Sequence, residues 1–402
     1  MSQPESSAQQ LPTVPSEITP EWLGSKLGHK IKSIKHTRSI WGTGSKLFYT
    51  ITYEDDNDND NHPSRPTHIC IKGVFDSTML ASQPWTLSLA QREADFFSLL
   101  APDLLLADTT PINFPQTYWA STSPHQGISI MTDLTSSGCT FPPELGSYPL
   151  STVLEGIDQL AALHARYWGQ SQLNHPWISN TYDTAMKFLC SPSTFNEAVR
   201  DPDRFKLPAY LMNGKRFHMA LDRYFSTRNP KFQTLLHGDT HMGNIFFSPS
   251  SSPSMSPSMS PSPSPAPSPS LSPKRQGKIG FLDWSALHFG SCFHDVVYFV
   301  TAMMTVQDRR AHEYEILDQY LETLHQRGGP RFDRRKDEEV MNEYKRSFMT
   351  GAIWLVCPFD LQSKERVGEL CERAVAGFGD HGVLELVLGE APHDKEGSCV
   401  VL

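Results

Sequence analysis

The chain has 402 residues, of which 38% are hydrophobic and 20% charged, and its formal net charge at pH 7 is -9. This length accommodates two lobes with separate cores, and the composition is that of a globular protein. The negative charge argues against a nucleic-acid partner, because such a partner usually requires a basic face. The seven cysteines show no zinc-binding spacing, and the first residues lack the features of a secretory signal. We therefore expect reduced thiols and a cytoplasmic location.

The first third of the chain predicts a sheet with few helices. Thr19 and Pro20 mark the start of a short helix that ends at Leu27, because threonine caps helices and proline suits their first position. Apolar and polar residues then alternate with a period of two, which is typical of strands. Strands are expected at residues 34–54, 67–75, 116–120 and 127–132, and one helix is expected at residues 87–100.

Helical patterns dominate the rest of the chain. Thr152 and Glu155 have the spacing of a capping box, which predicts a helix start there, and Gly169 predicts the end of that helix. Further helices are expected at residues 210–226, 291–306, 311–326, 337–356 and 362–376.

Residues 248–275 alternate serine and proline and differ from everything around them. Such a run cannot bury apolar surface or form regular backbone hydrogen bonds, so we expect it to be disordered. It separates two short apolar strands, at residues 244–247 and 278–283. A long polar loop between paired strands costs little, because loop-closure entropy grows only slowly with length. The acidic run at residues 54–60 is likewise interpreted as a solvated loop.

The segment LLHGDTHMGNIFF, residues 235–247, places Asp239 and Asn244 on a polar loop between apolar strands. Phosphoryl transfer requires a base for the acceptor hydroxyl and oxygen ligands for Mg²⁺. Asp239 is therefore the candidate catalytic base and Asn244 a candidate metal ligand. Asp283, at the end of the next apolar strand, is the second candidate metal ligand.

A lysine and a glutamate upstream form a second candidate pair. Lys72 shares one face of its expected strand with Cys70, and Glu93 lies on the apolar stripe of the expected helix. A carboxylate on such a stripe is costly without a partner. We therefore predict that Glu93 pairs with Lys72 and fixes it against the phosphates of a nucleotide.

A glycine-containing turn precedes Lys72 by one strand. It consists of Gly42, Thr43, Gly44 and Ser45. Glycines allow backbone N–H groups to approach phosphate oxygens, so this turn is a candidate phosphate cradle. An ordinary glycine turn is the alternative.

With these motifs in line, the sequence resembles the aminoglycoside phosphotransferase and choline/ecdysteroid kinase-like superfamily over about residues 30–305. The motifs that carry the resemblance are LLHGDTHMGNIFF, FLDWS and LAALHARYW. The resemblance implies an α+β, protein-kinase-like fold with two lobes. A tail and short helix (1–29) would precede an antiparallel sheet lobe with one helix (30–132). A larger, mainly helical lobe (133–390) and a tail (391–402) would follow.

The resemblance also assigns roles to residues. It implies ATP and Mg²⁺ as cofactors, with Asp239 as catalytic base and the other two oxygen-bearing side chains as metal ligands. It implies that Met131, Thr132 and Leu134 belong to the hinge that meets the adenine, and that Asp295 braces the catalytic loop.

These expectations describe an ATP-dependent phosphotransferase that acts on a hydroxyl group of a small molecule. The acceptor is left open, and four residues are candidate pocket liners: Asp222, Glu313, Asp318 and Trp354. A protein kinase is disfavoured, because His241 stands where a lysine is usual and no long activation loop follows Asp283. A catalytically silent nucleotide-binding or regulatory protein is the other alternative, although every catalytic position is filled.

The last four residues, beginning at Cys399, fit a prenylation signal of the geranylgeranyl type. No polybasic stretch precedes them, so a lipid on Cys399 would give only weak membrane association. A frayed apolar tail is the alternative.

Overall fold

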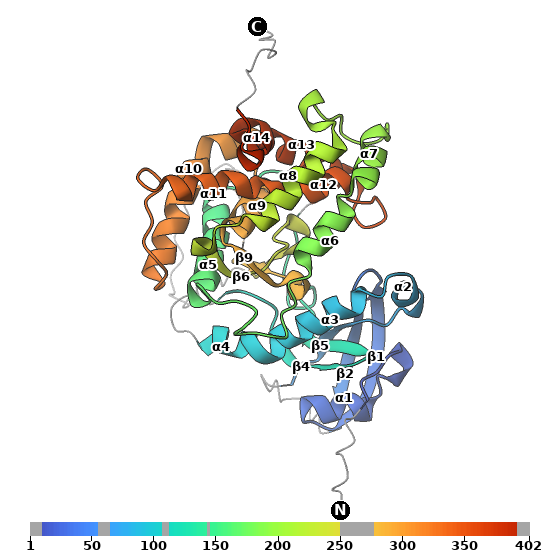
Figure 1. Ribbon diagram of the computed structural model, residues 1–402. Helices are drawn as coiled ribbons and strands as arrows, with labels where there is room; N and C mark the ends of the chain where they lie inside the picture. Colours follow the sequence, from blue (N-terminus) through green and yellow to red (C-terminus); the bar gives the residue numbers. More distant parts are fainter. Residues whose placement is uncertain (1–9, 55–64, 107–111, 143–144, 250–276, 392–402) are drawn as a thin grey trace, which may run out of the picture.

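The computed structural model describes residues 10–54, 65–106, 112–142, 145–249 and 277–391. They form a small lobe built on a sheet and a larger helical lobe (Figure 1). Most of the acidic run, the serine- and proline-rich run and Cys399 lie outside the described residues. Across the described ranges, each helix lacks the length or the apolar content needed to cross a bilayer.

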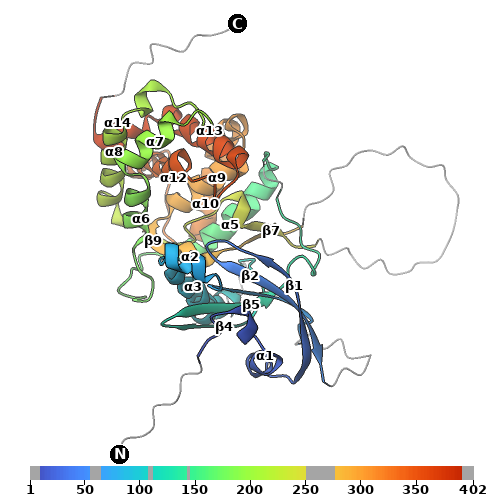
Figure 2. The ribbon, with the colours of Figure 1, turned by 90° about the vertical axis from the view of Figure 1, so that its right-hand side faces the viewer.

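The small lobe is a five-stranded antiparallel sheet of order β1-β2-β3-β5-β4. The helix α3 lies between this sheet and the large lobe, and α1 lies at the far side of the sheet (Figures 1 and 2). A π-helical turn, Phe96–Leu100, joins α3 to α4. The elements are α1 (Pro20–Leu27), β1 (Ile31–Ile40), β2 (Ser45–Tyr53), β3 (His68–Gly73), α2 (Ser77–Ser82), α3 (Thr86–Asp95), α4 (Ala101–Leu106), β4 (Thr117–Ser123) and β5 (Gln126–Thr132).

The period-two pattern of the strands divides the sheet into two faces. The face of Leu47 and Ile71 forms a core with Trp22 of α1. The expected helix start is confirmed, because Thr19 Oγ1 accepts a hydrogen bond of 3.1 Å from the N–H of Trp22. Leu11 also joins this core, so the segment expected as a separate tail and helix packs on the small lobe.

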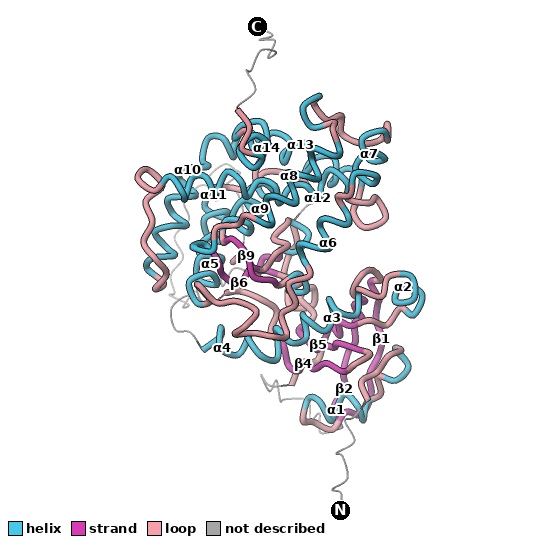
Figure 3. The backbone as a smooth tube through the Cα atoms, viewed as in Figure 1, coloured by secondary structure: helices cyan, strands magenta, loops and turns pink. Residues whose placement is uncertain are grey.

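The large lobe is mainly helical, with two short antiparallel strand pairs, β6–β9 and β7–β8 (Figure 3). The pair β7–β8 confirms the hairpin expected on either side of the serine- and proline-rich run. The elements are α5 (Leu150–Arg166), α6 (Tyr182–Leu189), α7 (Pro192–Arg200), α8 (Gly214–Ser226), β6 (Gln233–Leu236), β7 (Ile245–Phe247), β8 (Ile279–Phe281), β9 (His288–Ser291), α9 (Phe293–Met303), α10 (Val306–Gln326), α11 (Glu338–Arg346), α12 (Ala352–Val356), α13 (Lys364–His381) and α14 (Val383–Leu388).

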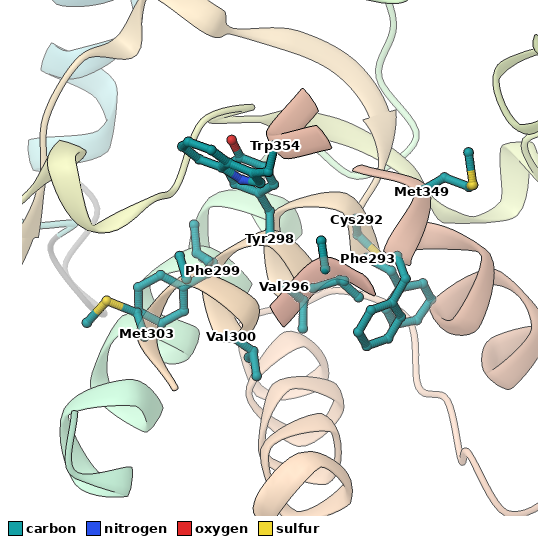
Figure 4. Close-up of a cluster of buried hydrophobic side chains, with 14 of the residues drawn as sticks. Cys292, Phe293, Val296, Tyr298, Phe299, Val300, Met303, Met349 and Trp354 are labelled. Atoms are coloured by element: carbon teal, nitrogen blue, oxygen red, sulfur yellow. The ribbon is translucent and has the colours of Figure 1, made fainter. Parts of the chain in front are cut away.

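Helix α9 is the centre of the large-lobe core, and all of its residues are buried. Figure 4 shows its side chains spreading in several directions, with Met349 on one side and Trp354 on another. The ring of Tyr298 stacks against Trp354 of α12, with centroids 6.1 Å apart and planes 20° from parallel. A helix that is buried on all sides in this way is a core helix.

The predicted capping box at Thr152 is wrong. Helix α5 begins two residues earlier, after Pro149, and the backbone N–H of Thr152 already donates to the carbonyl of Pro149. Proline fixes its own backbone angle and starts the helix without a side-chain cap. Gly169 does follow the end of α5, with φ +71°.

Candidate active site

The loop between β6 and β7 brings Asp239 and Asn244 together. The side-chain N–H₂ of Asn244 donates to Asp239 Oδ2 at 2.8 Å and to the Asp239 carbonyl at 2.9 Å. This leaves the side-chain oxygen of Asn244 as its acceptor atom toward a cation. The five-residue spacing of Asp239 and Asn244 thus corresponds to a turn that is closed by hydrogen bonds between these two residues.

Asp295, at the start of α9, fixes this loop by hydrogen bonds to its backbone. Its carboxylate accepts hydrogen bonds from the backbone N–H groups of His237 at 2.7 Å and Gly238 at 2.9 Å. Its Oδ2 also lies 3.2 Å from His164 Nε2. Burial alone would raise the pKa of Asp295, but its hydrogen bond and electrostatic interaction with His164 outweigh this effect and hold that pKa below its usual range. Gly238 has φ +85°, which a residue with a side chain rarely adopts.

Asp283 follows β8 in an unusual backbone conformation. Its φ is 58°, and it is the one non-glycine residue with positive φ in the described ranges. Such strain is costly and is found mostly where function requires it. The preceding residue, Leu282, donates its N–H to the carbonyl of Asn244 at 2.7 Å, which fixes Asp283 beside the loop.

Lys72 of β3 joins the two lobes electrostatically. Its Nζ lies 2.7 Å from Glu93 Oε2 and 3.0 Å from Asp283 Oδ2. The predicted Lys72–Glu93 contact is therefore present, and Glu93 also accepts the N–H of Trp284 at 3.2 Å. Burial would lower the pKa of Lys72, but the carboxylates of Asp283 and Glu93 raise it above its usual value. Burial would raise the pKa of Asp283, but Lys72 and Lys46 lower it. The lysine and aspartate are both charged at neutral pH.

The helix that carries Glu93 is anchored to the segment that carries Asp283. Arg92 donates to the carbonyl of Ser285 at 3.2 Å and to Ser179 Oγ at 2.6 Å in the large lobe. Phe96 stacks on Trp284 with ring centroids 4.1 Å apart and planes within 4° of parallel. These contacts fix α3 against the large lobe.

A cavity of about 360 Å³ lies between the lobes above these residues. Arg38 stacks on Phe48 at 3.7 Å and pairs with Asp133 at 3.3 Å, so these residues form one wall. The side-chain hydroxyl of Thr132 is bonded to Tyr118 at 2.8 Å. The sequence-predicted residues that line the cavity are Lys72, Glu93, Met131, Thr132, Leu134, Asn244 and Asp283.

The residues of the glycine turn, Gly42 to Ser45, differ in how close they lie to the cavity. Thr43 and Gly44 line a small space that adjoins the cavity beside Lys72. A Cβ on Gly44 would meet Lys72 Cε at 3.1 Å, whereas a Cβ on Gly42 would meet nothing within 4 Å. Ser45 is buried at the start of β2 and pairs with Gly73. Gly44 is therefore the position where a side chain would crowd the lysine.

The donor set fits a magnesium ion held together with a nucleotide. Within the described ranges, His, Cys, Asp and Glu side chains form no group of three placed to hold a metal. Asp283 and Asn244 instead supply two oxygen-bearing side chains to one cavity. Mg²⁺ is commonly bound by one or two protein oxygens, with phosphate oxygens and water completing its octahedron.

Two residues beside Asp239 had no assigned role in the sequence analysis. His241 Nδ1 accepts the N–H of Gly243 at 2.9 Å, so the neutral ring carries its proton on Nε2, 3.6 Å from Asp239 Oδ2. Burial lowers the pKa of His241, which favours this neutral form. Tyr298 of α9 lies close to Asp239, and burial first and the charge of Asp239 after it raise the pKa of Tyr298 well above its usual value. The sequence could have indicated that His241 lies near Asp239, because it follows that residue by two positions. Nothing local indicates Tyr298, which lies on the distant helix α9.

The candidate acceptor liners are mostly elsewhere. Trp354 lies next to the site, 5.5 Å from the ring of His241. The other three form ion pairs away from it: Asp222 with Lys187, Glu313 with Arg309 and His381, and Asp318 with Arg334.

The predicted α+β architecture, with its antiparallel sheet lobe and larger helical lobe, defines a two-lobed, protein-kinase-like protein. The family model described as "Uncharacterized oxidoreductase dhs-27" matches residues 277–372, which include Asp283 and Asp295. All strand pairs in the described ranges are antiparallel, unlike the parallel sheet with which dinucleotide-dependent oxidoreductases bind their cofactor. No curated protein matches the chain in sequence.

Similar solved structures include the choline kinase LicA from Streptococcus pneumoniae, at 13% identity, TM-score 0.46, covering 91% of this chain and 99% of that one. A microcompartment-associated aminopropanol kinase is 12% identical, with TM-score 0.43 and coverage of 91% and 99%. The amicoumacin kinase hAmiN, solved with AMP-PNP and Ca²⁺, is 10% identical, with TM-score 0.43 and coverage of 86% and 88%. The family-model match covers FLDWS, one of the motifs that carry the resemblance to the aminoglycoside phosphotransferase and choline/ecdysteroid kinase-like superfamily.

Proposed function

We propose that this protein transfers the terminal phosphoryl group of ATP, together with Mg²⁺, to a hydroxyl group of a small molecule. One observation carries the proposal: Asn244, whose side chain is bonded to Asp239, lines one cavity between the lobes together with Asp283 and Lys72. Phosphoryl transfer is catalysed mainly by positioning and charge stabilisation, and these residues offer both.

Each side chain has a role that its surroundings support. Asn244 and Asp283 would hold the metal, which when bound neutralises charge on the phosphate oxygens. Lys72 would bind the phosphates, and Glu93, with its side chain 3% exposed, would keep Lys72 in place. Asp239 would accept the proton of the acceptor hydroxyl. Its Oδ2 is already oriented by the N–H₂ of Asn244, and the neutral hydroxyl of Tyr298 would be a further donor to it.

The chain after Asp283 favours a small acceptor over a peptide. Between Asp283 and α9 the chain forms only a short turn and the buried strand β9. These residues are all described, and they leave no extended activation loop on which a peptide could lie. The stacked rings of Tyr298 and Trp354 instead lie near the candidate base and His241.

The experiment is a screen for ADP release from ATP·Mg²⁺ with amino alcohols, sugars, steroids and hydroxylated secondary metabolites. We expect at least one class to stimulate turnover by the wild type and not by Asp239→Asn. Asp222→Asn is the matched control, because Asp222 is exposed and pairs with Lys187. A protein that binds ATP·Mg²⁺ but turns over no acceptor at any concentration would instead be the catalytically silent alternative.

A further inference from the structure

We infer that Lys46 is a second phosphate-binding cation, which contacts the terminal phosphates of the nucleotide beside Lys72. This inference rests on the proposed function and adds to it a residue that the motifs do not mark. Two ammonium groups line the cavity. That of Lys72 is paired with carboxylates, whereas that of Lys46 has no such partner among the described residues.

The register of the sheet places the two lysines side by side. Lys46 on β2 is paired with Lys72 on β3, and both line the cavity between the lobes. Directly paired residues of adjacent strands project to the same face. Phe48, two residues further along β2, also lines this cavity, opposite Cys70 in the register. Lys46 therefore lies nearer than Phe48 to the glycine turn, at the end of the cavity where Asp283 and Lys72 lie.

The two lysines differ in their partners. Lys72 has both Glu93 and Asp283 within 3.0 Å. In the described part of the chain, Lys46 takes part in no hydrogen bond or ion pair with a neighbouring side chain. Its side chain is partly buried. Burial and the charge of Lys72 lower the pKa of Lys46, whereas Asp283 and Glu93 raise it by less. An ammonium group held in this way is costly unless a ligand supplies the opposite charge.

A polyphosphate supplies that charge in the right place. The ammonium groups of Lys46 and Lys72 lie on the same face of neighbouring strands and repel each other. Phosphate oxygens between them would offset this repulsion. If Asp283 held a metal, its contact with Lys72 would weaken, and more positive charge would face the phosphates. Charge-assisted contacts of this kind are stronger than neutral hydrogen bonds.

The test is calorimetric titration of the full chain with ATP·Mg²⁺, ADP·Mg²⁺ and adenosine. Lys46→Met should weaken ATP·Mg²⁺ binding by about tenfold or more, ADP·Mg²⁺ binding by less, and adenosine binding not at all. Lys46→Arg should retain most of the affinity, because it keeps the charge. Lys35→Met is the matched control, since Lys35 is exposed on the neighbouring strand β1.

Two results would overturn the inference. One is a Lys46→Met variant that binds ATP·Mg²⁺ as tightly as the wild type. The other is a variant that loses adenosine and ATP·Mg²⁺ equally, which would show a structural role. If the wild type itself does not bind ATP·Mg²⁺, the proposed function is wrong, and the inference about Lys46 is wrong with it. The first two results leave the proposed function standing, so the two failures are distinguishable.

Discussion

Lys72 and Asp283 form an ion pair between the lobes, with Nζ 3.0 Å from Oδ2. Asp283 is also the carboxylate that we propose as a metal ligand. If Asp283 holds the metal as we propose, lysine and metal would compete for one carboxylate. Binding of ATP·Mg²⁺ would then be an exchange, in which Asp283 would turn from the ammonium group to the metal and Lys72 to the phosphates.

Removing the lysine should destabilise the fold. In Lys72→Met, the carboxylate of Glu93 remains buried with only the N–H of Trp284 as a partner. An uncompensated buried charge of this kind costs about 3–5 kcal/mol, which urea denaturation would measure. The double variant Lys72→Met/Glu93→Gln should recover most of that free energy of unfolding. A single variant as stable as the wild type would contradict a charged pair.

Replacing the candidate base should separate chemistry from binding. Asp239→Asn keeps the size of the side chain but cannot accept the proton of an acceptor. We expect kcat to fall by roughly 10²–10⁴-fold while the Kd for ATP·Mg²⁺ is unchanged. Steady-state kinetics and calorimetry check the two quantities independently. Near-normal turnover would remove Asp239 from the chemistry.

Tyr298 should contribute less than the base that it orients. Tyr298→Phe removes the hydroxyl that we propose as a donor to Asp239 and leaves the stacking on Trp354 in place. Loss of one hydrogen bond to a charged group predicts a decrease in kcat of roughly tenfold or more, with little change in the KM for ATP. Tyr298→Leu should add a loss of stability. If Tyr298→Phe raised the KM for ATP instead, the hydroxyl would act on the nucleotide.

Acid should destabilise the protein through Asp295. Its pKa is lowered in the folded state, so the unfolded chain binds more protons in the acid range. The contribution of Asp295 is present above the unfolded pKa of about 3.9 and is lost as pH falls toward the folded pKa. Denaturation midpoints measured from pH 6 downward to roughly pH 3 should therefore fall less steeply for Asp295→Asn than for the wild type. Parallel curves would contradict the bracing role.

The sequence predicted contacts that depend on local spacing or on an energetic necessity. The cap of α1 by Thr19 and the turn of Asp239 and Asn244 are local. The pairing of Glu93 with Lys72 followed from the cost of burying a lone carboxylate, although the two residues lie on different elements.

Other features could not be predicted because they depend on tertiary structure. The Lys72–Asp283 contact requires the left-handed backbone of Asp283, which no local pattern indicates. Arg92 bonds to Ser179 in the other lobe, and Tyr298 reaches Asp239 from the central helix α9. The capping box at Thr152 failed for a local reason, since Pro149 had already started the helix.

The most direct test of the central claim is calorimetric titration of the wild type and Asp283→Asn with ATP, with and without Mg²⁺. The wild type should bind ATP more tightly by about tenfold or more when Mg²⁺ is present, because Asp283 and Asn244 hold the metal against the phosphates. Asp283→Asn should lose this dependence and still bind adenosine. Binding of ATP that is indifferent both to Mg²⁺ and to Asp283, or no binding of ATP at all, would contradict the account.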